Sequence, residues 1–221
     1  MPWVSYKTDQ FPPMTEADKQ NNVTIIYNEL SAKGYSLEAI SAICGNMESE
    51  GILNPAQYEI GRNYDVYNYG AGLCGWTPVY VTGSSATHLG NWCDSEGLDW
   101  LDGDSQLKYL DYELTDWNGT ERFFRNPSAP SCGYPTNPPI TAKEFVASPE
   151  NVNTLAAYWM LYYEHPANPK ASMATRKANA SKWYEYLCGS PTPPDPPTPP
   201  GPPTPVKTNK LPLWMMLRPI L

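Results

Sequence analysis

The chain has 221 residues, 41% of them apolar, which is enough for one domain with a substantial core and a smaller additional segment. Its 15 Lys and Arg residues are outnumbered by 23 Asp and Glu residues, which argues against nucleic-acid binding through a basic surface. The first residues lack an apolar run of signal-peptide length, so export by the general secretory route is not predicted.

Residues 1–14 are expected to form an irregular arm, because they contain three prolines and no sustained periodicity. Thr15 followed by Asp18 is typical of a helix N-terminus, and this helix is predicted to end near Gly34. Its buried face is predicted from apolar residues at helical spacing, namely Val23, Ile26, Tyr27 and Leu30.

The next helix is predicted to follow the N-cap Ser36 and to end at Gly51, which can adopt the left-handed conformation of a helix terminus. Glu50 lies on the margin of its apolar stripe and is expected to be half-buried. Glu48 is turned about 100° from that stripe and is expected to be exposed. The stripe itself consists of Ile40, Ile43, Cys44 and Met47.

The position of Glu50 makes it a candidate general acid. A carboxyl among apolar side chains, near the negative end of a helix dipole, is expected to keep its proton near neutrality. Cleavage of a glycosidic bond requires such a group.

Residues 56–81 are rich in Tyr, Val, Gly and Asn, which favours a small antiparallel sheet or β-hairpin. Their glycines allow close approach of a polymer, and their aromatic rings offer flat faces to sugar rings. For any single aromatic residue the alternative is an ordinary core position. The aromatic residues are Tyr58, Tyr64, Tyr67, Tyr69 and Trp76.

Glu59 and Asp65 are the candidates for a second carboxylate. It would lie about 5–5.5 Å from the acid in a retaining glycosidase and about 6.5–9.5 Å away in an inverting one. The alternative for each is a solvated loop charge.

Residues 86–103 contain no metal-ligand pattern, and no metal or cofactor is predicted. A helix is expected to begin near Asp104 or Ser105, and residues 118–139 read as a long surface loop. The apolar face of that helix would contain Leu107, Leu110, Leu114 and Trp117, and its solvated face Asp111, Glu113 and Asp116.

Thr141 and Glu144 form a capping box that opens a short helix, and Ser148 opens a second one that is predicted to be the central buried helix and to stop at Pro166. A last helix is predicted from about Ala171 to Leu187.

The five cysteines are scattered, with none of the close pairs that zinc sites use. Cys44 and Cys74 are interpreted as small buried residues. For Cys93 and Cys132, a disulfide bond between them is the alternative to free thiols.

Ten of the 25 prolines lie between Pro191 and Pro205, which predicts an extended linker over residues 189–206. The apolar run that follows spans 11 residues and is too short for a membrane helix, which needs about 20. We interpret residues 207–221 as a docking peptide; the alternative is a remnant of a longer chain or a lost domain.

Three stretches together resemble the phage tail lysozyme family, closest to the tail-tip lysozyme domain of short-tailed phages. They are GNMESE with LNP at residues 45–55, GAGLCGWTP at 70–78 and YEHPANP at 163–169. The resemblance covers roughly residues 15–188 and places the family's catalytic acid at Glu50. The family usually has Gln where this chain has Gly75, so one substrate hydrogen bond is in question.

The resemblance implies an α+β, mostly helical, lysozyme-like domain over residues 15–188, with the hairpin region beside its cleft. The substrate-binding candidates are Tyr69, Gly72, Trp76, Tyr163 and Glu164; for the last two the alternative is structural packing. It also implies cleavage of β-1,4 bonds in peptidoglycan during delivery of phage DNA, by a protein of the virion tail that is in the host cytoplasm before assembly. The alternatives are a lytic transglycosylase and a non-catalytic glycan-binding or structural tail protein. Tail proteins are expected partners of the C-terminal peptide.

Overall fold

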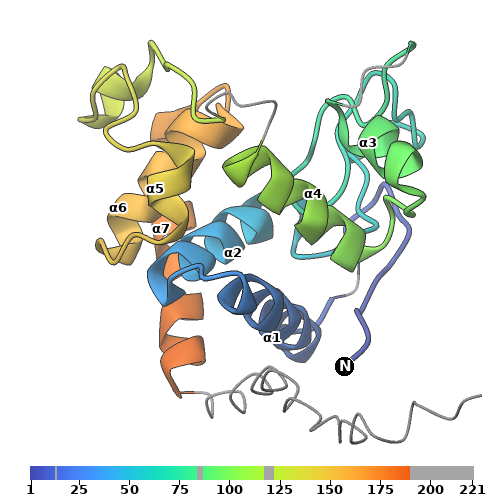
Figure 1. The fold of residues 1–221 in the computed structure, drawn as a ribbon, viewed down its shortest axis with the longest axis horizontal. Helices are drawn as coiled ribbons and strands as arrows, with labels where there is room; N and C mark the ends of the chain where they lie inside the picture. The colour runs from blue at the N-terminus through green and yellow to red at the C-terminus, as the bar shows by residue number, and fades with distance from the viewer. Residues whose placement is uncertain (13, 84–86, 117–121, 190–221) are drawn as a thin grey trace, which may run out of the picture.

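The computed structural model describes residues 1–12, 14–83, 87–116 and 122–189 (Figure 1). The predicted proline-rich linker, the apolar peptide and Trp117 lie outside these residues. The helical elements in chain order are α1 (Glu16–Ala32), α2 (Leu37–Gly51), α3 (Leu89–Glu96), α4 (Gly103–Thr115), the short 3₁₀ helix η2 (Ala129–Cys132), α5 (Ala142–Val146), α6 (Val152–Trp159), the π-helix η3 (Met160–Glu164) and α7 (Pro169–Gly189).

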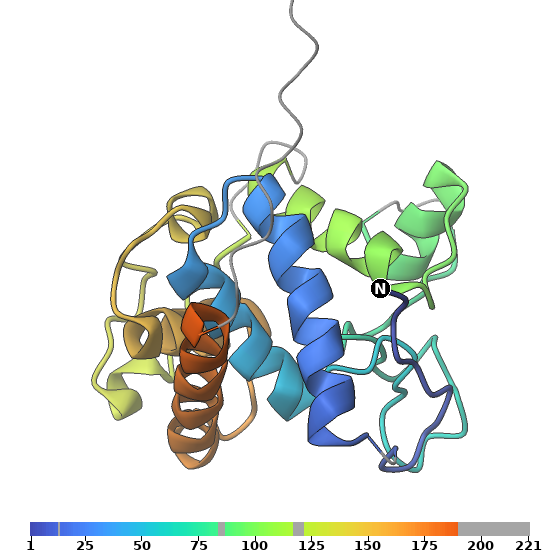
Figure 2. The same cartoon turned by 90° about the horizontal axis from the view of Figure 1, so that it is seen from below.

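Helix α2 is the central helix of the fold. The sequence had predicted that the later helix, observed as α6, would be central. All residues of α2 from Ala39 to Met47 are buried, and α7 and α6 pack along it (Figures 1 and 2). A Cβ atom on Gly45 would lie 2.4 Å from the backbone nitrogen of Ala180 in α7. A glycine is therefore required where these two helices cross.

The N-terminal caps of α1 and α2 were predicted correctly. Thr15 forms a capping box with Asp18 at the start of α1, and Ser36 caps α2 through the backbone nitrogen of Ala39. The C-terminus of α2 differs from the prediction, because Gly51 stays helical and Ile52 and Leu53 take the left-handed conformation, with φ of 55° and 60°. Left-handed backbone is uncommon for a β-branched residue, so the α2 terminus stores strain beside the candidate site.

The predicted β-hairpin is reduced to isolated bridges. Within the described residues no strand forms; Tyr58 pairs with Ala71, and Ala71 pairs with Trp76. The chain turns back at Gly72 and Gly75, both with positive φ, before a ladder of hydrogen bonds can extend. This loop region lies beside α4 and α3, on the other side of α2 from α6 (Figure 1).

Several other boundaries differ from the predictions. Helix α3 was missed: it is short, and no side chain caps its N-terminus. Asp102 caps α4, so this helix begins slightly earlier than predicted, and Asn151 rather than Ser148 caps α6. The helical path then continues through η3 to Glu164 and ends at His165, whose φ is 52°.

All five cysteines are free, so the Cys93–Cys132 bridge is not formed. Cys44 and Cys74 are buried as predicted. Among the described helices, none is long and apolar enough to span a bilayer.

Candidate active site

Glu50 stands in the last turn of α2, on the wall of a cavity of about 420 Å³. Its side chain is 28% exposed. The loops on either side of the bridges supply the facing wall, which includes Glu59 and Gly72. The candidate acid therefore opens into a space within the range of about 300–1,000 Å³ that small-molecule sites occupy.

The main polar partner of Glu50 is Arg176, in α7. One Nη of Arg176 donates to the Glu50 carboxylate in an ion pair, and the other donates to Asn46 Oδ1 at 2.9 Å. Arg176 is buried, so its position is fixed by the packing of α7 on α2. A buried guanidinium therefore lies beside Glu50, in addition to the apolar side chains that were expected there.

Glu48 is the more buried of the two α2 glutamates, although it was expected to be exposed. Its carboxylate accepts hydrogen bonds from Lys19 at 2.8 Å, from Lys182 at 2.8 Å and from the Trp183 indole at 2.9 Å. Burial raises the pKa of Glu48, but the hydrogen bonds from the two lysines outweigh burial and leave the pKa below its ordinary value. Glu48 thus ties α1, α2 and α7 together and does not enter the cavity.

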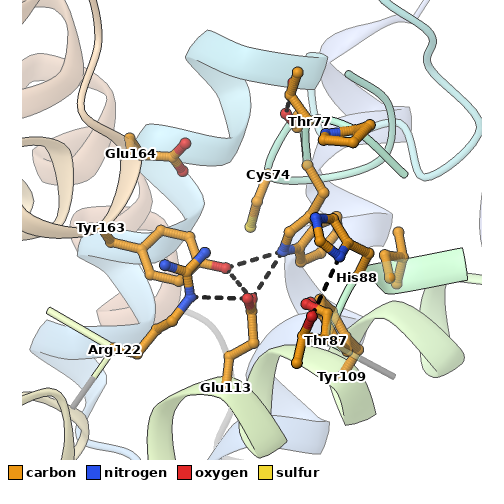
Figure 3. Close-up of a pocket in the computed structure, with 13 residues that line it drawn as sticks. Cys74, Thr77, Thr87, His88, Tyr109, Glu113, Arg122, Tyr163 and Glu164 are labelled. Carbon is orange, nitrogen blue, oxygen red and sulfur yellow. Dashed lines mark hydrogen bonds and ion pairs between the residues drawn. The ribbon is translucent and has the colours of Figure 1, made fainter. Parts of the chain in front are cut away.

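A second cavity, of about 300 Å³, adjoins the first, and both are lined by Gly75 and Thr77. Figure 3 shows Tyr163, Arg122 and Glu113 meeting on one side of it, with His88 and Thr87 opposite. This cavity is lined mostly by polar groups.

A hydrogen-bonded network built around Glu113 forms the floor of the second cavity. Glu113 accepts from Arg122 at 2.8 Å, from the Trp76 indole at 2.8 Å and from the Tyr163 hydroxyl at 2.5 Å (Figure 3). The Trp76 indole also donates to the Tyr163 hydroxyl at 3.0 Å. Glu113 was assigned to a solvated helix face, and the structure instead buries it among three donors.

Glu164 points into the second cavity from the end of η3 (Figure 3). Its Oε1 accepts a hydrogen bond from the Trp159 indole at 2.8 Å. Burial, followed by repulsion from the Glu50 carboxylate, raises the pKa of Glu164 to about 8. The site therefore brings Glu50, held by a guanidinium, close to a second carboxyl whose pKa is raised above neutrality.

Gly75 lines both cavities. It has φ of 59°, and a Cβ at this position would lie 3.4 Å from Glu50 Oε2. A side chain here would come into van der Waals contact with the candidate acid.

The remaining candidates are placed as follows. Glu59 pairs with Arg62 at 3.2 Å and shares the cavity of Glu50. Asp65 accepts from Asn68 and from the Tyr67 backbone, which stabilises a turn, and it is not part of that cavity wall. The Tyr69 ring lies under the Arg62 guanidinium, 4.5 Å from it.

Arg176 was not predicted as a site residue, although the sequence contains a signal for it. Arg176 shares the buried face of α7 with Ala180, Trp183 and Leu187, at helical spacing. An arginine in a core stripe needs a buried acceptor, and that requirement predicts a partner such as Glu50.

The structure is a mostly helical domain that brings Glu50 and Glu164 to the walls of two adjoining cavities. The sequence profile described as phage tail lysozyme matches residues 21–187. The chain belongs to this family, as its motifs predicted.

Among curated proteins, Morphogenesis protein 1 of Bacillus phage B103 is 35% identical to the chain over 170 residues. The match covers 76% of this chain and 40% of that relative, so the chain spans less than half the length of the protein it matches.

Proposed function

We infer that this domain cleaves the glycan strands of bacterial peptidoglycan, with Glu50 as the general acid. Glu50 would protonate the oxygen between two sugars as the C–O bond breaks. Water would then add to the oxocarbenium-like centre in a hydrolase, whereas the C6 hydroxyl of the substrate would add in a lytic transglycosylase.

The observation that supports this proposal best is the place of Glu50 at the end of a buried helix, fixed by Arg176 and open to a cavity. Fixed orientation matters because a general acid must come within about 2.6–3.2 Å of the oxygen that it protonates. The family membership of the chain supports the same substrate class.

The raised pKa of Glu164 and its place on the wall of the adjoining cavity support a second assignment of roles within the same reaction. A carboxyl whose surroundings raise its pKa is suited to the role of general acid. Glu164, with its pKa raised to about 8, would then supply the proton, and Glu50 would stabilise the positive centre or activate water. Glu59 is the further candidate for a second carboxylate, since it shares the Glu50 cavity.

The biological setting proposed here is wall degradation by a tail protein during delivery of phage DNA. The name of the B103 relative refers to morphogenesis, which fits a protein that is built into the virion. The C-terminal peptide would dock to another tail protein.

A glycan-binding or structural tail protein is the rival from another class. Zymography on wall-containing gels beside a pull-down with insoluble wall separates the two, because a binder sediments without clearing the gel. Mass spectrometry of the digested wall then tests the bond and the reaction together. Reducing sugars indicate hydrolysis and anhydro sugars indicate transglycosylation, and absence of any fragment from the parental protein would refute the proposal.

A further inference from the structure

The N-terminal arm, residues 1–12, is fixed to the domain by paired hydrogen bonds. The Asn22 side chain exchanges two bonds with the backbone of Val4, at 2.9 and 2.8 Å, and the Asn54 side chain does the same with Tyr6, at 3.0 and 2.8 Å. Both asparagines are fully buried. The arm therefore belongs to the folded domain, although it precedes the family match at residue 21.

The arm then runs along the loop that faces Glu50. Thr8 forms a parallel bridge with Gln57. The side-chain Nε2 of Gln57 also donates to the backbone carbonyls of Thr8 and Gln10, at 3.3 and 3.2 Å. Asp9 accepts from the backbones of Gly61 at 2.9 Å and Asn63 at 3.1 Å. Figure 2 shows this segment beside the loop region. The backbone is thus held in place up to Gln10.

Phe11, the next residue, is 75% exposed and lies on the wall of the same cavity as Glu50. Ile60 lies on that wall as well and is 44% exposed. A solvent-exposed phenyl ring on a fixed backbone, at a cavity that also contains a carboxylate, presents a flat apolar face beside polar groups. The pyranose rings of a glycan strand match this combination, because they have apolar C–H faces and a polar hydroxyl edge.

We propose that the N-terminal arm is part of the glycan-binding site and that Phe11 stacks on a sugar ring in the Glu50 cavity. This inference rests on the proposed function for its ligand. It assigns to residues outside the family match a role in strand binding: Phe11 supplies a wall that the matched residues alone do not provide. The occupant is a sugar of the strand, and the contact adds affinity and no chemistry.

The test uses the full chain with Glu50→Gln, so that the ligand is not consumed, and soluble glycan fragments prepared from peptidoglycan. Isothermal titration calorimetry should give a dissociation constant about threefold to tenfold weaker for Phe11→Ala in this background. Phe11→Trp should restore the parental value, because it keeps a flat ring. Phe124→Ala, which removes an exposed ring from outside the wall of this cavity, is the matched control and should bind as the parent does.

Thermal unfolding of each variant excludes a folding defect, which is not expected for a ring as exposed as that of Phe11. Equal affinity of Phe11→Ala and its parent overturns the inference, and so does a lack of binding by the parent. Failure of the proposed function gives a different result, since the protein without Glu50→Gln would then release no fragments while Phe11-dependent binding persisted.

Discussion

Arg176 and Glu50 form an ion pair that joins α7 to the last turn of α2, although the two residues are 126 positions apart in the chain. The same guanidinium donates to Asn46 at 2.9 Å, so one buried cation orients both the candidate acid and the amide one helical turn before it. The direction in which Glu50 points is consequently set by the packing of α7.

Removal of this cation should reduce both stability and activity. Arg176→Ala leaves the buried Asn46 oxygen without its donor and should lower the free energy of unfolding by about 2–3 kcal/mol. Arg176→Lys should recover only part of this loss, because one ammonium group replaces a fork of donors. Urea denaturation measures the effect. Lys170→Ala, an exposed change on the same helix, should stay within about 0.5 kcal/mol of the parent, and an equal loss for both alanine variants would contradict the account.

Glu48→Gln should destabilise the domain without affecting the chemistry. A folded-state pKa below the ordinary value of 4.5 stabilises the protein above that value, and this contribution disappears as the pH falls through the lowered pKa. The free energy of unfolding of the variant should therefore be about 1–3 kcal/mol lower than that of the parent at pH 7. The two values should converge below about pH 4. Unfolding at both pH values checks the prediction; a loss that does not depend on pH would refute it.

Glu164→Gln should stabilise the protein relative to its parent as the pH rises, whereas Glu48→Gln should destabilise it. Because the folded-state pKa is raised from 4.5 to about 8, the folded protein binds the extra proton between these values. The contribution of Glu164 is fully present below pH 4.5 and is lost as the pH rises to about 8. Between pH 5 and pH 8, the free energy of unfolding of the variant should therefore rise relative to that of the parent by about 1–3 kcal/mol.

Thermal unfolding across this range, in the parent and in Glu164→Gln, measures that difference. The pH–rate profile of wall cleavage adds a reading of the chemistry. If Glu164 supplies the proton, its replacement removes activity over the whole profile; if it only neighbours Glu50, activity persists with a shifted profile.

Gly75→Ala should impair the site more than the fold. The new Cβ would lie in van der Waals contact with Glu50 Oε2, at 3.4 Å, and φ of 59° would strain the backbone of the loop that contacts the carboxyl. We expect a stability loss of about 1 kcal/mol and a fall in turnover of about tenfold or more. Gly97→Ala, at φ of 68° with open space around it, is the matched control for strain alone and should keep parental turnover.

The parts of the fold that were predictable from the sequence depend on contacts between near neighbours. The caps at Thr15, Ser36 and Thr141 bind atoms three residues ahead, so their signals are complete within a short window. The apolar stripe of α2 was equally readable, because helical spacing alone defines it.

The errors concern polar residues whose partners lie far along the chain. Glu48 appeared exposed from its angle on the helix, but its lysine partners come from positions 29 and 134 residues away. Glu113 was misplaced for the same reason, since Trp76 and Tyr163 reach it from separate segments. A helical wheel shows where a side chain points and does not show which donors the tertiary fold brings to it.

The arm shows a related limit of local sequence signals. Prolines and missing periodicity correctly indicated irregular backbone for residues 1–14, but irregular backbone can still be fixed. Asn22 and Asn54 hold it through side-chain bonds that have no signature in the arm itself.

The rate at which Glu50→Gln protein releases sugar fragments from purified cell wall tests the central claim most directly. This replacement keeps the size of the side chain and its acceptor for Arg176, and removes the ionisable proton. We predict a rate lower than that of the parent by about 10²-fold or more, with the fold intact by thermal unfolding. Release at close to the parental rate would contradict the assignment of Glu50 as the acid.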